Sequence, residues 1–130
     1  MTRIESILER KSTLFGIVLL VVIGTLSIPI IMPHIFHGFH VVHIGLHVGG
    51  ITLAVFISLI ANIAYLRLKT KRLLFTAVAF SIFVVAESVL LIDATWPTLY
   101  DIGVVSLLEI GHILTITTLG LMALGVFRND

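Results

Sequence analysis

The sequence contains no cysteine. Disulfide bonds, thiolate metal sites, iron–sulfur clusters and covalent c-type haem attachment are therefore excluded. It also lacks a glycine-rich phosphate loop and the Gly-x-Ser-x-Gly and His-Glu-x-x-His motifs of well-known hydrolases. Charged residues are scarce, at 12% of the 130 residues, whereas hydrophobic residues make up 58%. The chemistry open to this chain must therefore come from a few polar side chains in apolar surroundings.

The apolar composition predicts a membrane protein. With a mean hydropathy of +1.20, a chain of this length cannot hide its apolar surface in a soluble core. Stretches of roughly 20 apolar residues can cross the hydrocarbon layer as helices, and such stretches cover about 13–32, 41–64, 73–92 and 102–126. We expect an all-α, integral, multi-pass membrane protein in which residues 1–130 form a single four-helix transmembrane domain, an up-down-up-down bundle in the lipid bilayer.

The basic residues predict the orientation. All eight Lys and Arg residues fall before the first expected helix, between the second and third, or after the fourth. By the positive-inside rule both termini are cytoplasmic, and we expect the cytoplasmic membrane. Because the basic residues are divided among short segments, attraction to anionic lipid explains them better than nucleic-acid binding does.

Histidines are concentrated toward the opposite, extracytoplasmic side. Five of the six lie within fourteen residues: His34, His37, His40, His43 and His47. Histidine is the commonest side-chain ligand of transition metals and a usual axial ligand of haem iron. At about 100° per residue, the last three share an arc of roughly 60° on the second expected helix. The first two follow Pro33 and are expected at the outer interface.

Ionisable residues of three expected helices fall at one depth. With a rise of about 1.5 Å per residue, His47, Glu87, Glu109 and His112 lie about 8 to 15 Å below the outer surface. An ionisable group inside a membrane helix costs at least about 2.5 kcal/mol, so such groups usually face the bundle interior and find partners. We therefore expect these side chains to meet.

One hypothesis is a bound haem b. It would lie between the second and fourth expected helices with His47 and His112 as axial ligands, and with His43 as a substitute for His47. Glycines beside these ligands would let the porphyrin approach the backbone. The glycines concerned are Gly50 and Gly111.

With histidines placed in this way, the chain resembles the membrane-integral b-type cytochromes built as four-helix bundles. The resemblance covers the architecture of most of the chain and the ligand positions His47 and His112. It implies one-electron transfer with a quinone or a redox protein as partner, by an electron carrier or cytochrome subunit rather than a stand-alone enzyme. Glu87 or Glu109 would then accept the imidazole N–H of a ligand.

The alternative hypothesis is a metal site without porphyrin. Glu109-x-x-His112 has the spacing found in di-iron carboxylate bundles, but the sequence holds only one such motif. A mononuclear site for iron, copper or zinc remains, since imidazole and carboxylate suit these ions. Its candidate ligands are His40, His43, His47, His112, Glu87 and Glu109.

A third hypothesis assigns no chemistry to the chain. In this case it is an accessory subunit of a larger membrane complex, and its buried polar groups fix helix packing. Gly45 and Gly49 match the small-x-x-x-small pattern of close helix packing. They predict a tight helix contact or a homodimer.

Overall fold

A computed structural model describes residues 10–34, 38–96, 101–102 and 105–127 of the chain. Four helices in it are long and apolar enough to span a membrane, at Lys11–Ile31, Val41–Leu68, Lys71–Thr95 and Leu107–Phe127. The expected four helical segments are thereby confirmed. They indicate a multi-pass integral membrane protein.

The first span changes its helical geometry near its end. Helix α2 (Lys11–Leu26) continues as a π-helix, η1 (Ser27–Ile31), and then as the short helix α3 (Met32–His34). Pro29 lies within the π-helical stretch and has no N–H for an α-helical hydrogen bond. A widened helical turn is one way to accommodate it.

The second and third spans form an antiparallel pair with a two-residue connection. Helix α4 (Gly38–Leu68) and helix α5 (Lys71–Thr95) are joined by Lys69 and Thr70. Lys69 has a φ of 54°, and its N–H donates to the Tyr65 carbonyl at 2.8 Å. The Thr70 hydroxyl accepts a hydrogen bond from the N–H of Leu73 at 3.3 Å and caps α5. Because two residues suffice for the turn, both helices extend beyond the expected 41–64 and 73–92.

The fourth span begins later than expected. Strands β1 (Asp101–Ile102) and β2 (Val105–Ser106) form a small antiparallel pair, and helix α6 covers Leu107–Phe127. The expected start near residue 102 therefore moves to residue 107. Ser106 caps the helix by accepting a hydrogen bond from the Glu109 N–H at 3.2 Å.

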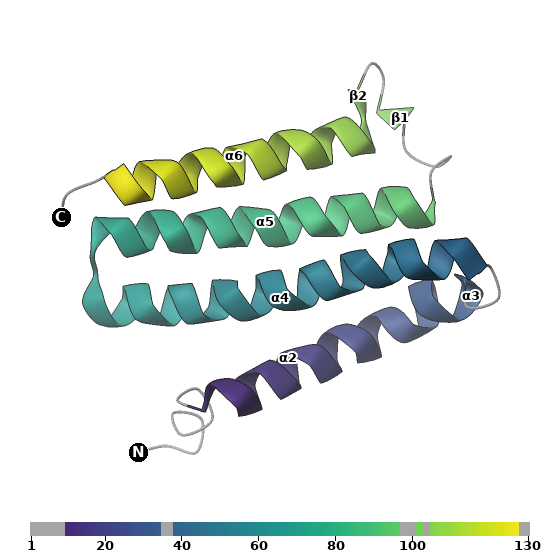
Figure 1. Ribbon diagram of the computed structural model, residues 1–130, viewed down its shortest axis with the longest axis horizontal. Coiled ribbons are helices and arrows are strands. Elements are labelled where there is room, and N and C mark those ends of the chain that lie inside the picture. Colours follow the sequence, from purple (N-terminus) through teal and green to yellow (C-terminus); the bar gives the residue numbers. More distant parts are fainter. Residues whose placement is uncertain (1–9, 35–37, 97–100, 103–104, 128–130) are drawn as a thin grey trace.

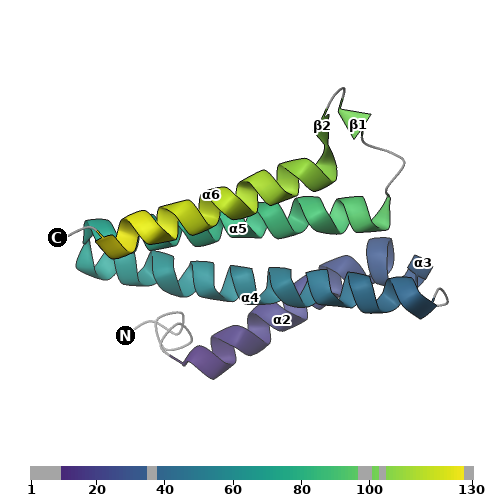
Figure 2. The ribbon, with the colours of Figure 1, turned by 45° about the horizontal axis from the view of Figure 1, so that its top comes forward.

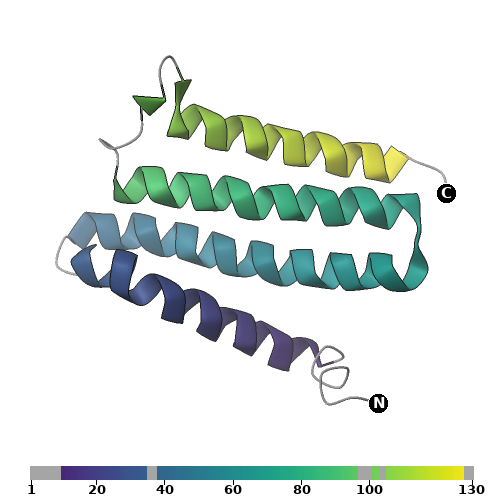
Figure 3. The same cartoon turned by 180° about the vertical axis from the view of Figure 1, so that it is seen from behind.

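The helices lie side by side in the order in which they occur in the chain. Figures 1 and 3 show α2, α4, α5 and α6 in a row. Helix α5 packs extensively against both α4 and α6, whereas α2 contacts mainly α4 and crosses it at an angle in Figure 2. Figure 1 also shows the first residues of α4 and of α6 at the same end of the molecule. Helix α5 thus lies between the two helices that carry His47 and His112.

The core is small and lies where α2, α4 and α5 meet. It consists of Leu14, Val18, Val22, Ile30, Ile44, Val48, Ile51 and Leu91. Many large apolar side chains point outward instead, among them Leu20, Leu46 and Ile116. Such an exterior suits lipid, which removes the cost of exposing apolar surface to water.

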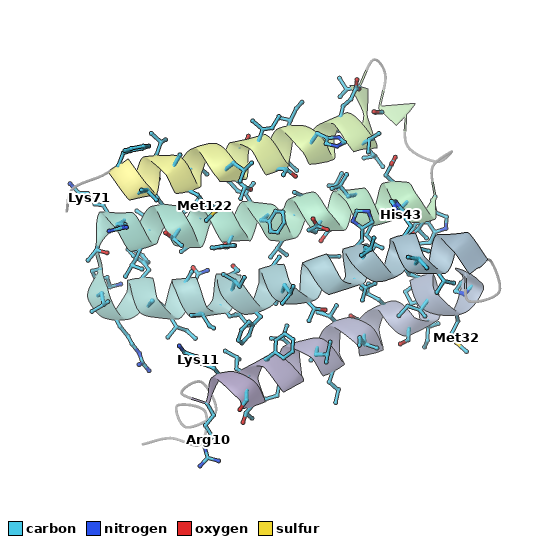
Figure 4. The ribbon with its side chains drawn as sticks, viewed as in Figure 1. Arg10, Lys11, Met32, His43, Lys71 and Met122 are labelled. Atoms are coloured by element: carbon cyan, nitrogen blue, oxygen red, sulfur yellow. The ribbon has the colours of Figure 1, made fainter. Side chains whose placement is uncertain are left out.

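Basic residues and the histidine region occupy opposite ends of the helix row. Figure 4 shows Arg10, Lys11 and Lys71 at one end, and Met32 and His43 at the other. The separation of charge and histidine expected from the sequence is therefore present in the fold.

Candidate metal site

The candidate site is centred on a contact between α4 and α5. The Nδ1 atom of His47 lies 3.1 Å from Oε2 of Glu87. Both side chains are largely enclosed, with exposed fractions of 18% and 15%. When the Glu87 carboxylate accepts from Nδ1–H of a neutral imidazole, Nε2 keeps its lone pair for another partner. The expected meeting of ionisable groups from separate helices is confirmed for this pair.

Gly50 provides the space for the Glu87 carboxylate. A Cβ atom at residue 50 would lie 2.6 Å from Oε2 and 3.0 Å from Cδ of Glu87. Such an approach is closer than van der Waals contact allows, so any larger residue would displace the carboxylate. Gly50 was expected to face a porphyrin, and in the structure the Glu87 carboxylate occupies that position.

A second imidazole lies against the first. His43 precedes His47 by one helical turn, and the two ring centroids are 4.9 Å apart with the rings nearly perpendicular. His43 is exposed, and Figure 4 shows it on α4 beside α5. Two histidines at i and i+4 present their rings on one face of a helix, the arrangement by which helices supply two ligands to one metal ion.

The donor set fits a transition-metal ion in part. Two imidazoles and a carboxylate that orients one of them reproduce the carboxylate–histidine–metal arrangement of many metal sites. Within the ranges that the structure describes, however, no three His, Asp or Glu side chains lie close enough together to hold a metal ion. His37 lies outside the described residues, and only the backbone of His34 and His40 is described. The two histidines therefore need a further ligand.

His112 does not supply that ligand within the same chain. Its Nδ1 donates to the Leu108 carbonyl at 2.8 Å, and its side chain is exposed on α6. Because α5 lies between α4 and α6 (Figure 1), His112 and His47 do not face each other across an interhelical gap. The described hydrogen bond of the His112 ring is thus within α6, and α5 separates it from the contact between His47 and Glu87.

The two histidines nevertheless lie at the same depth. Gly50 packs against Glu87, and Gly111 packs against Leu90, so both contacts can be placed along α5. Their separation of three residues corresponds to about 4.5 Å. Because α4 and α5 are antiparallel, His47, three residues before Gly50 on α4, lies level with Leu90, three residues after Glu87 on α5. His112 is adjacent to Gly111, which packs against Leu90. The predicted common layer is therefore present, although α5 divides it.

Glu109 caps a helix in the structure. Its Oε2 accepts hydrogen bonds from the Ser106 N–H at 2.9 Å and from the Ser106 hydroxyl at 3.2 Å. The Glu109 N–H donates in turn to Ser106 Oγ at 3.2 Å. This reciprocal pattern is a capping box, whose signature is Ser-x-x-Glu. The signature is visible in the sequence and predicts the start of α6. It accounts for Glu109 at this position without a functional role for the carboxylate.

The other glycines divide between packing and open surface. A Cβ atom at Gly111 would overlap the side chain of Leu90 on α5, so this glycine permits close packing of α5 and α6. A Cβ atom at Gly45 or Gly49 would meet nothing within 4 Å. Neither of these two glycines is required by a contact between the described residues of one chain.

A polar cluster in the other half of the α4–α5 interface was not predicted. Ser58 and Ser81 place their Oγ atoms 3.1 Å apart. The Asn62 amide donates to the Ser58 carbonyl at 2.8 Å and reaches Ser81 Oγ at 3.5 Å. Hydrogen bonds of this kind join membrane helices. The i, i+4 spacing of Ser58 and Asn62 was the available signal, and it indicates a face toward another helix rather than a reactive site.

Comparisons with protein-family models, with curated proteins and with solved structures gave no match to this chain.

Proposed function

We propose that the protein binds a transition-metal ion at the histidine end of the α4–α5 pair. His43 and His47 are the ligands on α4, and Glu87 on α5 orients His47. The observation that supports this function is the contact between His47 Nδ1 and Glu87 Oε2. A carboxylate that holds Nδ1–H fixes the ring and makes Nε2 a more basic ligand.

The ligand chemistry restricts the ion. Imidazole nitrogens suit zinc, copper and iron, whereas magnesium and calcium prefer oxygen ligands. The chain has no thiolate to offer and only three methionines, so a soft Cu(I) site is disfavoured. Zn²⁺, Cu²⁺ and Fe²⁺ are the ions for which the proposal is made.

The orientation of the site follows from the charges. Arg10, Lys11 and Lys71 lie at the end opposite His43 (Figure 4), and cytoplasmic ends of membrane helices are rich in Lys and Arg. We place both termini in the cytoplasm, the helices in an up-down-up-down order across the cytoplasmic membrane, and the metal site near its outer surface.

Haem b electron transfer is the second candidate. It is favoured by the common depth of His47 and His112 and by their matching hydrogen bonds, since each ring uses Nδ1 as a donor and keeps Nε2 for a ligand bond. Because α5 separates the two histidines within a chain, the axial ligands would have to come from two copies. A quinol or a redox protein is the partner class that this candidate implies.

Metal analysis together with a visible spectrum tests the proposal. The protein is purified in detergent from cells supplied with iron, copper, zinc and haem precursor, and the same is done for His47→Ala and, as control, His34→Ala. We expect bound metal without a haem spectrum in the wild type and in His34→Ala, and its loss in His47→Ala. A red protein with a sharp alpha band after reduction would show that haem is bound instead of a bare metal ion. A colourless, metal-free wild type would overturn both candidates and favour an accessory subunit.

A further inference from the structure

We propose that His112 of a second copy completes the metal site formed by His43 and His47, in a two-fold symmetric dimer with α5 at its centre. This inference rests on the proposed function for the identity of the bound group. The contact between the two copies has its own test.

The first support is the exposure of His112 in a membrane-spanning helix. Its side chain is exposed on α6 between apolar residues, with Leu108 47% and Ile113 59% exposed. A polar side chain that faces lipid carries a free-energy cost, and such groups in membrane helices usually face a partner. The Nε2 atom, with Nδ1 bonded to Leu108, is the atom that a partner would contact.

The second support is the incomplete site on α4. His43 is exposed beside His47, and no three metal-binding side chains come together within the described part of one chain. Structural zinc sites take four ligands, and catalytic sites take three from the protein. A third imidazole at the same depth is what the pair lacks, and His112 lies at that depth.

The third support is that His43 and His112 lie on the same face of the helix row. At about 100° per residue, His43 lies about 30° behind the side of α4 that contacts α5, and His112 about 120° ahead of the corresponding side of α6. The side of α4 that contacts α5 is marked by the mean direction of Gly50, His47 and Ser58, which all touch α5. The corresponding side of α6 is marked by the mean direction of Gly111 and Gly125. Helices α4 and α6 run in the same direction and lie on opposite sides of α5 (Figure 1). A backward rotation on α4 and a forward rotation on α6 therefore point to the same face of the helix row.

Among the residues that the structure describes, no other helix covers that face. Helix α2 covers the other face, where Val22 and Ile30 pack with Ile51 and Leu91. On the histidine face, large apolar side chains of α4 and α6 are exposed. They include Leu46 (69%), Leu53 (52%), Leu108 (47%) and Leu119 (61%).

Two-fold symmetry brings the complementary groups together. When two copies stack through this face about an axis along the membrane normal, α5 lies opposite α5, and α4 of one copy lies opposite α6 of the other. An isologous contact of this kind repeats itself, so the dimer holds two identical sites. Each site would contain two histidines of one copy and His112 of the other.

Cysteine cross-linking tests the contact without any metal. The natural chain has no cysteine, so every disulfide would come from the introduced residues. We expect Leu46→Cys combined with Leu108→Cys to give a covalent dimer in membranes, because these positions face each other between the two copies. Each single variant should stay monomeric on a denaturing gel. Cross-linking of Gly49→Cys alone, with none from the double variant, would place the contact on the Gly45–Gly49 face and overturn this one.

Complementation between two variants tests the ligand. A chain with His112→Ala and a chain with His43→Ala and His47→Ala are co-expressed with different tags, and the mixed dimer is purified through both tags. We expect the bound metal to return to about half of the wild-type amount, because one of the two sites regains all its histidines. Each variant alone should bind little.

The outcomes separate this inference from the proposed function. A wild type that holds metal, with His112→Ala holding just as much, would overturn the role of His112 and leave metal binding in place. A wild type without metal would overturn metal binding, while the cross-linking result would still decide whether the two copies meet through this face.

Discussion

Gly50 on α4 and Glu87 on α5 are matched in shape: a Cβ atom at residue 50 would lie 2.6 Å from the carboxylate oxygen that receives the His47 hydrogen bond. A residue without a side chain thus allows a carboxylate to approach a histidine inside an apolar helix pair.

Gly50→Ala should displace the Glu87 carboxylate and weaken metal binding by about 10- to 100-fold, the usual effect of losing a hydrogen-bonding partner of a ligand. The matched control is Gly49→Ala, whose Cβ atom would meet nothing within 4 Å. Alanine favours helix over glycine by about 1 kcal/mol, so the control should bind metal normally and melt no lower than the wild type. Equal binding by both variants would show that Glu87 does not act through its contact with His47.

Glu87→Gln should give a similar loss in affinity, again about 10- to 100-fold, while the protein remains folded. Glutamine keeps the size of the side chain but removes the charge that makes the His47 imidazole a stronger ligand. Titration of the metal-free protein with Zn²⁺ measures the affinity. An unchanged affinity for Zn²⁺, with the helix content intact by circular dichroism, would show that Glu87 does not strengthen metal binding by His47.

Glu109→Ala should lower stability by about 1 kcal/mol through loss of the capping box and should leave metal binding unchanged. Glutamine can serve at this capping position, so Glu109→Gln should restore most of the stability. The melting temperature in detergent and the metal content are measured on the same samples. Loss of metal from Glu109→Gln would show that Glu109 contributes to the metal site.

Gly111→Ala should destabilise the α5–α6 contact, because the added methyl group overlaps the Leu90 side chain. Overpacking of this kind costs about 1 to 3 kcal/mol. Truncation of Leu90 to alanine should remove most of this penalty in the double variant, and Gly120→Ala, with nothing within 4 Å, is the control. Additive melting shifts for Gly111→Ala and Leu90→Ala would show that the two positions do not interact.

The number of helices and the separation of charge from histidine could be predicted from the sequence. Both follow from composition, because long apolar runs must be helical in lipid and basic residues collect at the ends of the spans. The exact start of α6 could not be predicted from apolar periodicity alone, since residues 102–106 are as apolar as the helix that follows. The Ser106-x-x-Glu109 pattern was the better signal.

The meeting of His47 with Glu87 was predictable from depth, whereas the neighbours of each helix were not. Depth along a helix depends on a constant rise per residue. The order of helices around one another depends on side-chain packing, such as the close contact of Gly111 with Leu90 that places α6 beside α5. This is why the sequence predicted one common layer for His47 and His112 but not the presence of α5 between them.

The most direct test of the central claim is an electron paramagnetic resonance spectrum of the purified protein loaded with one equivalent of Cu²⁺, which binds nitrogen ligands more tightly than the other first-row divalent ions. The account predicts couplings from coordinated imidazole nitrogens in the wild type and in His34→Ala, and their loss in the variant with His43→Gln and His47→Gln. A copper signal without imidazole couplings, or couplings that persist in the His43→Gln and His47→Gln variant, would contradict it.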